Sequence, residues 1–199
     1  MSNSIENNKR IAKNTLLLYF RMFFMMIVSL YTSRIVLSTL GIEDFGIYNV
    51  VGGVVSMFSF LNGAMATSTQ RYLTFELGKE GNVDQMRKVF NASIIIHALI
   101  SIFILILAET VGMWFIYSYM TIPDSRMDAA LWVYQFSILS MIVLVMSVPY
   151  NACIIAHERM KVFAYISVLE VILKLLIVYI LVLGDIDKLK LYAVLIFCV

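Results

Sequence analysis

The sequence predicts an all-α integral membrane protein that is folded as a multi-span helical bundle. Hydrophobic residues make up 61% of the 199 residues, and the mean hydropathy is +0.89. Charged residues make up only 14%, whereas soluble domains carry about 25%. A membrane helix needs about 20 apolar residues. The chain offers five such runs and a sixth, shorter run, so we expect five full spans and a truncated sixth.

The chain begins with a polar, basic segment, residues 1–14, which we expect to be a cytoplasmic lead-in. The transmembrane part, residues 15–199, follows it, and its first span is predicted over 15–39. This run is too long for the core of a signal peptide, contains arginines and has no small-residue cleavage site. We therefore interpret it as a span that is retained in the protein.

A tight connection is expected to separate the first span from a second span over 47–70. Gly41 and Gly46 are predicted to supply the turn, since glycine tolerates the backbone angles of tight turns. Glu43 and Asp44 mark the connection as a polar tip between two helices. The sequence thus predicts a helical hairpin in the membrane.

Four further spans are predicted from the remaining apolar runs, over 92–114, 129–156, 163–183 and 189–199. Aromatic residues that follow the first of these runs resemble the aromatic belt at a membrane surface. Pro149 is expected to bend the helix that contains it. The last run stops short of a full span, so we expect the chain to be truncated.

The distribution of basic residues predicts the orientation of the chain. Of the 15 lysines and arginines, nine lie in the amino-terminal segment, in 71–88 or in 157–161. The three alternate connections, near Gly41, Pro123 and Asp185, hold three. Because cytoplasmic loops are enriched in Lys and Arg, the amino terminus is predicted on the cytoplasmic side.

Ionisable side chains inside the predicted spans are the strongest candidates for function, because each costs about 2.5 to 3.5 kcal/mol at a helix centre. They are Arg21, Arg34, His97, Glu109, Glu170 and Lys174. Two interpretations of the arginines stay open. Their long stems can reach the headgroups, or their guanidinium groups can face an inner cavity. Two arginines on one helix favour an anionic ligand over a cationic one.

Glu170 and Lys174 lie one turn apart on one helix face, which allows an ion pair. A self-neutralising structural pair is one interpretation. In the other, Lys174 contacts a substrate phosphate or Glu170 takes up a coupling cation. Glu109 is expected within reach of Arg34 and Lys174, and His97 is interpreted as a hydrogen-bonded packing residue or a proton relay.

The polar run from Asn62 to Gln70 predicts either a contact between helices or a cavity wall that binds sugars. Cys153 and Cys198 fall in apolar runs with no second ligand nearby, so we expect no disulfide and no metal site. The sequence contains no phosphate-binding loop and no nucleophile with a positioned base. We therefore expect no enzyme activity, no cofactor and no nucleic-acid partner.

Three segments resemble the polysaccharide transporter and O-antigen flippase branch of the multidrug/oligosaccharidyl-lipid/polysaccharide (MOP) flippase superfamily. The first segment is residues 40–48, LGIEDFGIY, which follows Ser33 and Arg34. The others are residues 71–81, RYLTFELGKEG, and residues 149–161, PYNACIIAHERMK. They occur in order at matching helix boundaries, and the similarity covers essentially the whole chain.

The resemblance implies a two-lobed transporter of which this chain is the first lobe. Such proteins move undecaprenyl-pyrophosphate-linked oligosaccharides, the precursors of lipopolysaccharide and exopolysaccharide, across the bacterial plasma (inner) membrane by alternating access. A cavity arginine on the first helix is thought to hold the pyrophosphate, which corresponds here to Arg21 or Arg34. The implied partners are the lipid-linked oligosaccharide, membrane lipid, a glycan polymerase and glycosyltransferases.

We therefore expect Arg21, Arg34 and Lys174 to supply cations to a cavity, with Glu170 and Glu109 tuning the charge or coupling an ion. Two alternatives stay open. A cation-coupled multidrug exporter of the same superfamily commonly carries an acidic residue on its first helix, and the first span here has none. A non-transporting scaffold for glycan assembly would not need the intramembrane charges at all.

Overall fold

A computed structural model describes residues 2–79, 83–183 and 187–199, and in these residues every regular element is helical. The predicted all-α class is therefore confirmed for the described part of the chain. Met1, residues 80–82 and residues 184–186 lie outside it. The elements are α1 (Ser2–Ser56), α2 (Ser59–Gly78), α3 (Val83–Leu107), the π-helical turn η1 (Ala108–Gly112), α4 (Met113–Tyr119), the 3₁₀ turn η2 (Asp124–Arg126), α5 (Met127–Ala156), α6 (Met160–Leu183) and α7 (Lys188–Phe197).

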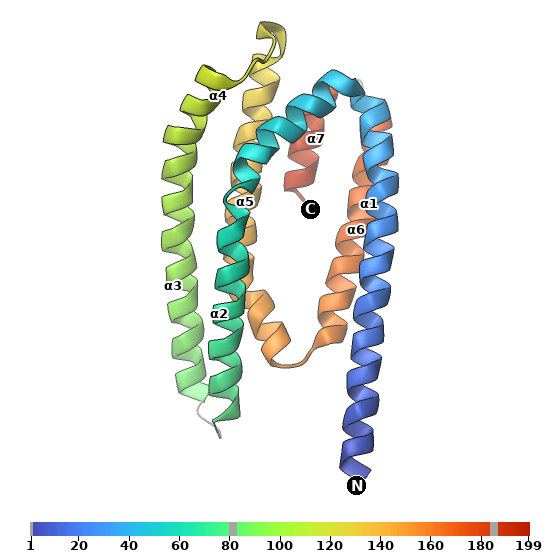
Figure 1. Cartoon of the computed structure of the whole chain (residues 1–199), viewed down its shortest axis with the longest axis vertical. Coiled ribbons are helices and arrows are strands. Elements are labelled where there is room, and N and C mark those ends of the chain that lie inside the picture. The colour runs from blue at the N-terminus through green and yellow to red at the C-terminus, as the bar shows by residue number, and fades with distance from the viewer. Residues whose placement is uncertain (1, 80–82, 184–186) are drawn as a thin grey trace.

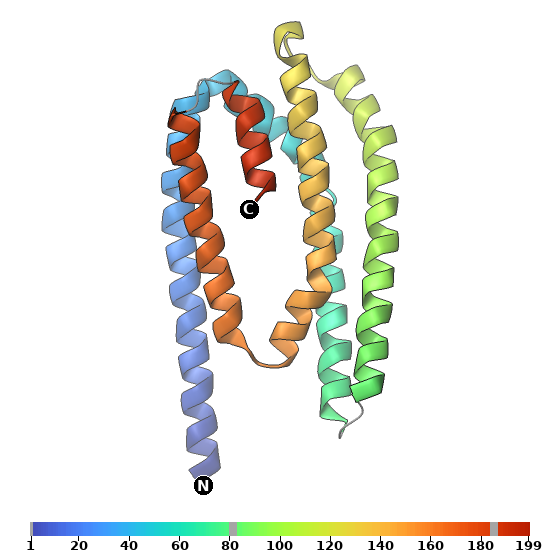
Figure 2. The same ribbon diagram turned by 180° about the vertical axis from the view of Figure 1, so that it is seen from behind.

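The helices form an elongated bundle in which α5 contacts α1, α2, α3, α6 and α7. Helices α1 and α6 lie side by side and run in the same direction, while α2 and α3 lie against α5 (Figures 1 and 2). The amino terminus lies at the same end as the α2–α3 and α5–α6 connections (Figure 1). The bend in α1, the turn η2 and the start of α7 lie at the opposite end, which we call the η2 end. The connections thus alternate between the two ends, as was assumed when the orientation was predicted from the basic residues in alternate connections.

Helix α1 bends sharply at Gly41, where φ is 80° and ψ is 172°. Glycine suits this position because a positive φ strains residues that carry a Cβ. The predicted turn at Gly41 is therefore observed, but Gly46 is not part of it and lies in helical structure. A single glycine is enough to redirect the chain.

The second predicted span, 47–70, is not one continuous helix. Helix α1 continues past the bend to Ser56, and α2 begins at Ser59. The break is closed by a backbone hydrogen bond of 3.1 Å from the Phe58 amide to the Val55 carbonyl, which tightens the last turn of α1. The hydropathy of the run is continuous, so it gave no signal for this break.

Among the described residues, four helical segments are long and apolar enough to cross a membrane, by length and composition alone. They are Thr15–Ser56, Val83–Tyr119, Asp124–Ala156 and Met160–Leu183. This differs from the prediction of five full spans and a truncated sixth. Helix α2 is less apolar because of its polar residues between Asn62 and Gln70, and α7 has only 10 residues.

The main core surrounds α5, whose inward face is almost fully buried. Val133, Tyr134 and Ile138 pack there against Val51 of α1 and Ile104 of α3. A second core joins α1, α6 and α7 and is made of Val36, Ile177, Val178, Leu181 and Tyr192. The two cores hold α5 and the α1–α6 pair in place, and this pair carries Arg21, Arg34, Glu170 and Lys174.

Candidate functional site

The arginines predicted to face a cavity lie on the part of α1 that packs along α6. Tyr31 lies beside Tyr179 of α6, and the two helices run in the same direction (Figures 1 and 2). With a rise of about 1.5 Å per residue, Arg21 lies at nearly the same height as Glu170. Thirteen residues separate Arg21 from Arg34, which places them about 20 Å apart along the axis. The two arginines therefore mark two depths of one helix.

The burial of the two arginines also differs. Arg34 is exposed on α1, about 10 Å along the helix from the bend at Gly41, and it forms no ion pair among the described residues. Arg21 is partly buried. The structure thus brings Arg21 to the level of the charged residues of α6, while Arg34 lies nearer the η2 end.

Glu170 and Lys174 form the ion pair that their spacing predicts. The Lys174 ammonium donates to the Glu170 carboxylate at 2.6 Å, and both side chains are about 40% exposed. The i,i+4 arrangement with the acid first is the favourable order on a helix. The pair neutralises two charges that would otherwise be costly in hydrocarbon.

Replacing one member of this pair is expected to be more harmful than replacing both. Lys174→Met leaves the Glu170 charge uncompensated and should cost on the order of 2 kcal/mol. Adding Glu170→Gln should restore the melting temperature in detergent to near that of the parent. A double variant that is as unstable as the single variant would contradict this account. A double variant that is stable but does not transport would instead reveal a functional role.

Glu109 lies in the π-helical turn η1, between α3 and α4. Its carboxylate is exposed and accepts a hydrogen bond of 3.3 Å from Gln135 of α5. The predicted pairing of Glu109 with Arg34 or Lys174 is not observed among the described residues, since Lys174 pairs with Glu170. Contacts across helices depend on which faces meet, and η1 lies against α5.

A tyrosine from α5 completes the same π-helical turn. The Tyr134 hydroxyl donates a hydrogen bond of 2.7 Å to the carbonyl of Ala108, and both residues are fully buried. Gly112 makes room for this ring, because a Cβ at Gly112 would lie 1.9 Å from the Tyr134 oxygen. A π-helical turn of this kind often occurs at functional positions, and here it is held by a buried contact.

The polar run of α2 is used in part for packing against α3. The Thr69 hydroxyl lies 3.3 Å from the Ser93 hydroxyl, and both side chains are buried. Nδ1 of His97 lies 2.7 Å from the Ser93 carbonyl oxygen, so His97 is a hydrogen-bonded packing residue, one of the two interpretations of its sequence position. Asn62 and Gln70 are only partly buried.

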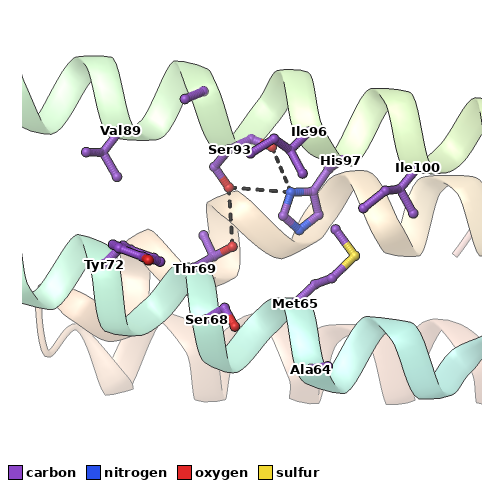
Figure 3. A pocket seen from close by; sticks show the side chains of 11 residues that line it. Ala64, Met65, Ser68, Thr69, Tyr72, Val89, Ser93, Ile96, His97 and Ile100 are labelled. Carbon is purple, nitrogen blue, oxygen red and sulfur yellow. Dashed lines mark hydrogen bonds between the residues drawn. The ribbon is translucent and has the colours of Figure 1, made fainter.

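A pocket of about 440 Å³ lies between α2 and α3. Ser68 and Thr69 of α2 and His97 of α3 contribute polar groups to a wall that is otherwise largely apolar (Figure 3). None of the cations expected in a cavity lines this pocket, and neither do Asn62 and Gln70. The pocket is therefore separate from the α1–α6 charges.

The structure also reveals a charge cluster that the sequence analysis did not identify. The Arg126 guanidinium pairs with the Asp44 carboxylate at 2.5 Å and with the Asp187 carboxylate at 3.2 Å. Asp44 is only 5% exposed, and the other Asp187 oxygen accepts the amide of Leu189 at the start of α7. Lys190 pairs with Asp128 beside this cluster. One arginine thus links the bend of α1, the turn η2 and the start of α7.

Asp44 belongs to the connection that the sequence marks as a polar tip between two helices, and in the structure its side chain is buried there. A signal for the cluster was present, since the predicted topology brings the connections near Gly41, Pro123 and Asp185 to one end. Two of these connections carry acids and the third carries Arg126. Opposite charges on neighbouring connections are candidates for pairing, but the sequence did not show that the pairing would be buried.

Comparison with known proteins identifies the family. The MatE family model matches residues 18–180, which is most of the chain. No match is found among curated proteins, and none among solved structures. The matched region contains most of the spanning part of α1, the π-helical turn, all of α5 and the Glu170–Lys174 pair. The chain belongs to the MatE family of the MOP superfamily, whose members are membrane transporters and not enzymes.

Proposed function

We propose that this chain is one lobe of a flippase that moves a lipid-linked oligosaccharide across the bacterial plasma membrane, with its amino terminus in the cytoplasm. One observation carries the proposal. The spanning part of α1 before the bend holds two arginines and no acidic residue. A substrate with a pyrophosphate group is anionic and would be attracted to such a helix, whereas a cationic drug would be repelled.

The position of Arg21 supports this proposal. Arg21 lies at the height of Glu170. Lys174 lies about one helical turn further along the direction in which α1 and α6 both run. Arg34 lies about 20 Å further along, so a phosphate that crosses the membrane would meet cations at two depths. Arginine suits this role because its guanidinium can bind phosphate oxygens in a bidentate manner.

The remaining elements of the proposal concern transport and partners. A second lobe would complete the cavity, and the two lobes would rock about the bound substrate to expose it on alternate sides. Glu170 would set the charge available at Lys174, and Glu109 would tune charge at the π-helical turn. A glycan polymerase and glycosyltransferases would be the partners of the transporter in glycan assembly.

Complementation tests the proposal directly. The full-length protein is expressed in a bacterium that lacks its own glycan-lipid flippase, and surface glycan is measured with a membrane-impermeant label. We expect the parent to restore labelling, and Arg21→Glu and Arg34→Glu each to reduce it at least tenfold at equal membrane levels. Arg34→Lys keeps the charge and should retain most of the activity.

Lys79→Gln serves as the control, since it removes a cation whose side chain is 56% exposed and pairs with Glu76 at the end of α2. This variant should export normally. Undiminished export by Arg34→Glu and Arg21→Glu would refute the phosphate role. Failure of the parent with several glycans, together with drug resistance, would favour the cation-coupled exporter. Normal function after removal of all intramembrane charges would favour a scaffold.

A further inference from the structure

His97 has a buried ring nitrogen without a hydrogen-bond partner among the described residues. The side chain is 1% exposed, and its Nδ1 contacts the Ser93 carbonyl oxygen at 2.7 Å. A carbonyl oxygen can only accept, so Nδ1 carries the proton and Nε2 of the neutral ring is an acceptor. No partner is found for this Nε2 within the described chain. Buried polar groups almost always have a partner, which makes this one a candidate for a ligand contact.

The unpartnered nitrogen faces the pocket between α2 and α3. In Figure 3 the free edge of the His97 ring points into the space between Met65 and Thr69. Ile96 and Ile100 line the pocket beside it, and Tyr72 lies toward its other end. Tyr72 and Ile96 are more than half exposed, so they form an accessible rim above a floor that contains His97.

The depth of the pocket suits a molecule dissolved in the membrane. His97 lies nine residues beyond Lys88 on α3, which is about 13 Å along the helix axis. Counted from the start of the span predicted over 92–114, His97 lies five residues, or about 8 Å, inside a hydrocarbon core that is about 30 Å thick. No lysine, arginine or carboxylate lines the pocket, so a charged ligand would find no counter-charge there.

We propose that the α2–α3 pocket binds a membrane-dissolved alcohol, a long hydrocarbon with one hydroxyl group that donates a hydrogen bond to Nε2 of His97. The hydrocarbon would pack along the apolar wall formed by Met65, Ile96 and Ile100. Hydrocarbon offers a hydroxyl group no acceptor for its hydrogen bond, and Nε2 of His97 supplies one within the membrane. The proposal rests on the α2–α3 geometry alone and does not depend on the proposed flippase function.

Photolabelling of the full-length protein in phosphatidylcholine vesicles tests the proposal. The probe is a hexadecanol that carries an alkyl diazirine, and its methyl ether is the matched control without a donor. After irradiation, modified peptides are located by mass spectrometry. We expect alcohol adducts on the α2–α3 pocket and at least fivefold fewer adducts there with the ether.

Two substitutions at His97 distinguish the contribution of Nδ1 to alcohol binding from that of Nε2. His97→Asn keeps an amide donor near the Nδ1 position, where it can still contact Ser93, but has no group at the Nε2 position. His97→Gln places an amide oxygen near the Nε2 position. We expect His97→Asn to reduce alcohol labelling to the level of the ether, and His97→Gln to keep it within about twofold of the parent.

Several results would overturn the proposal. Equal labelling by the alcohol and the ether in the parent protein would show that the pocket takes hydrocarbon without recognising a hydroxyl, and this comparison needs no variant. Unchanged labelling of a folded His97→Asn variant would exclude the Nε2 contact. Competition by phenol but not by unlabelled hexadecanol would assign the pocket to a soluble ligand and refute the membrane alcohol.

Discussion

Gly112→Ala is expected to destabilise the protein by about 3 kcal/mol, the sum of an overpacked core and a lost buried hydrogen bond. A Cβ at this position would lie 1.9 Å from the Tyr134 hydroxyl oxygen. Tyr134 is fully buried, so its ring has little room to move. If the ring shifts, the Ala108 carbonyl loses the hydroxyl that donates to it at 2.7 Å.

Thermal unfolding in detergent measures this effect, and two further variants test whether the contact with Tyr134 causes it. Gly53→Ala makes the same chemical change at a helical glycine that has no atom within 4 Å of an added Cβ, so it should be neutral or slightly stabilising. Tyr134→Phe removes the oxygen that the new methyl group would meet. The double variant Gly112→Ala/Tyr134→Phe should therefore be more stable than Gly112→Ala alone. Equal stability of Gly112→Ala and Gly53→Ala would contradict the account.

Arg126→Ala is expected to give the second large loss of stability, about 2 to 3 kcal/mol. The change leaves the buried Asp44 carboxylate without its ion-pair partner and also releases Asp187. Breaking a fully buried pair costs about 3 to 5 kcal/mol, and we expect a smaller loss here because the Arg126 side chain is 34% exposed. For a chain of this size the melting temperature should fall by about 4 to 12 °C.

The control for Arg126 is the neighbouring pair of Lys190 and Asp128, whose acid is 75% exposed. Lys190→Ala should change stability by less than about 1 kcal/mol, as is usual for surface ion pairs. Adding Asp44→Asn to Arg126→Ala removes the stranded charge and should recover part of the loss. If Arg126→Ala had the same melting temperature as Lys190→Ala, the cluster would contribute little to the stability of the fold.

The sequence alone determined the class of this protein and much of its helical outline. Apolar runs and their length predict membrane helices because crossing hydrocarbon requires a local excess of apolar residues. Helix α6 is observed at Met160–Leu183 against an expected 163–183, and α5 at Met127–Ala156 against 129–156. The Glu170–Lys174 pair was also predictable, since residues four apart on a helix are neighbours whatever the fold.

Only the tertiary structure decided which side chains meet across helices. Arg126 is 82 residues from Asp44 and 61 from Asp187, and Tyr134 is 26 residues from Ala108. Such pairs form because particular faces of distant helices are packed together, and helical periodicity carries no information about the partner face. The polar Nε2 of His97 likewise became a candidate site only when packing of α2 against α3 buried it beside a pocket.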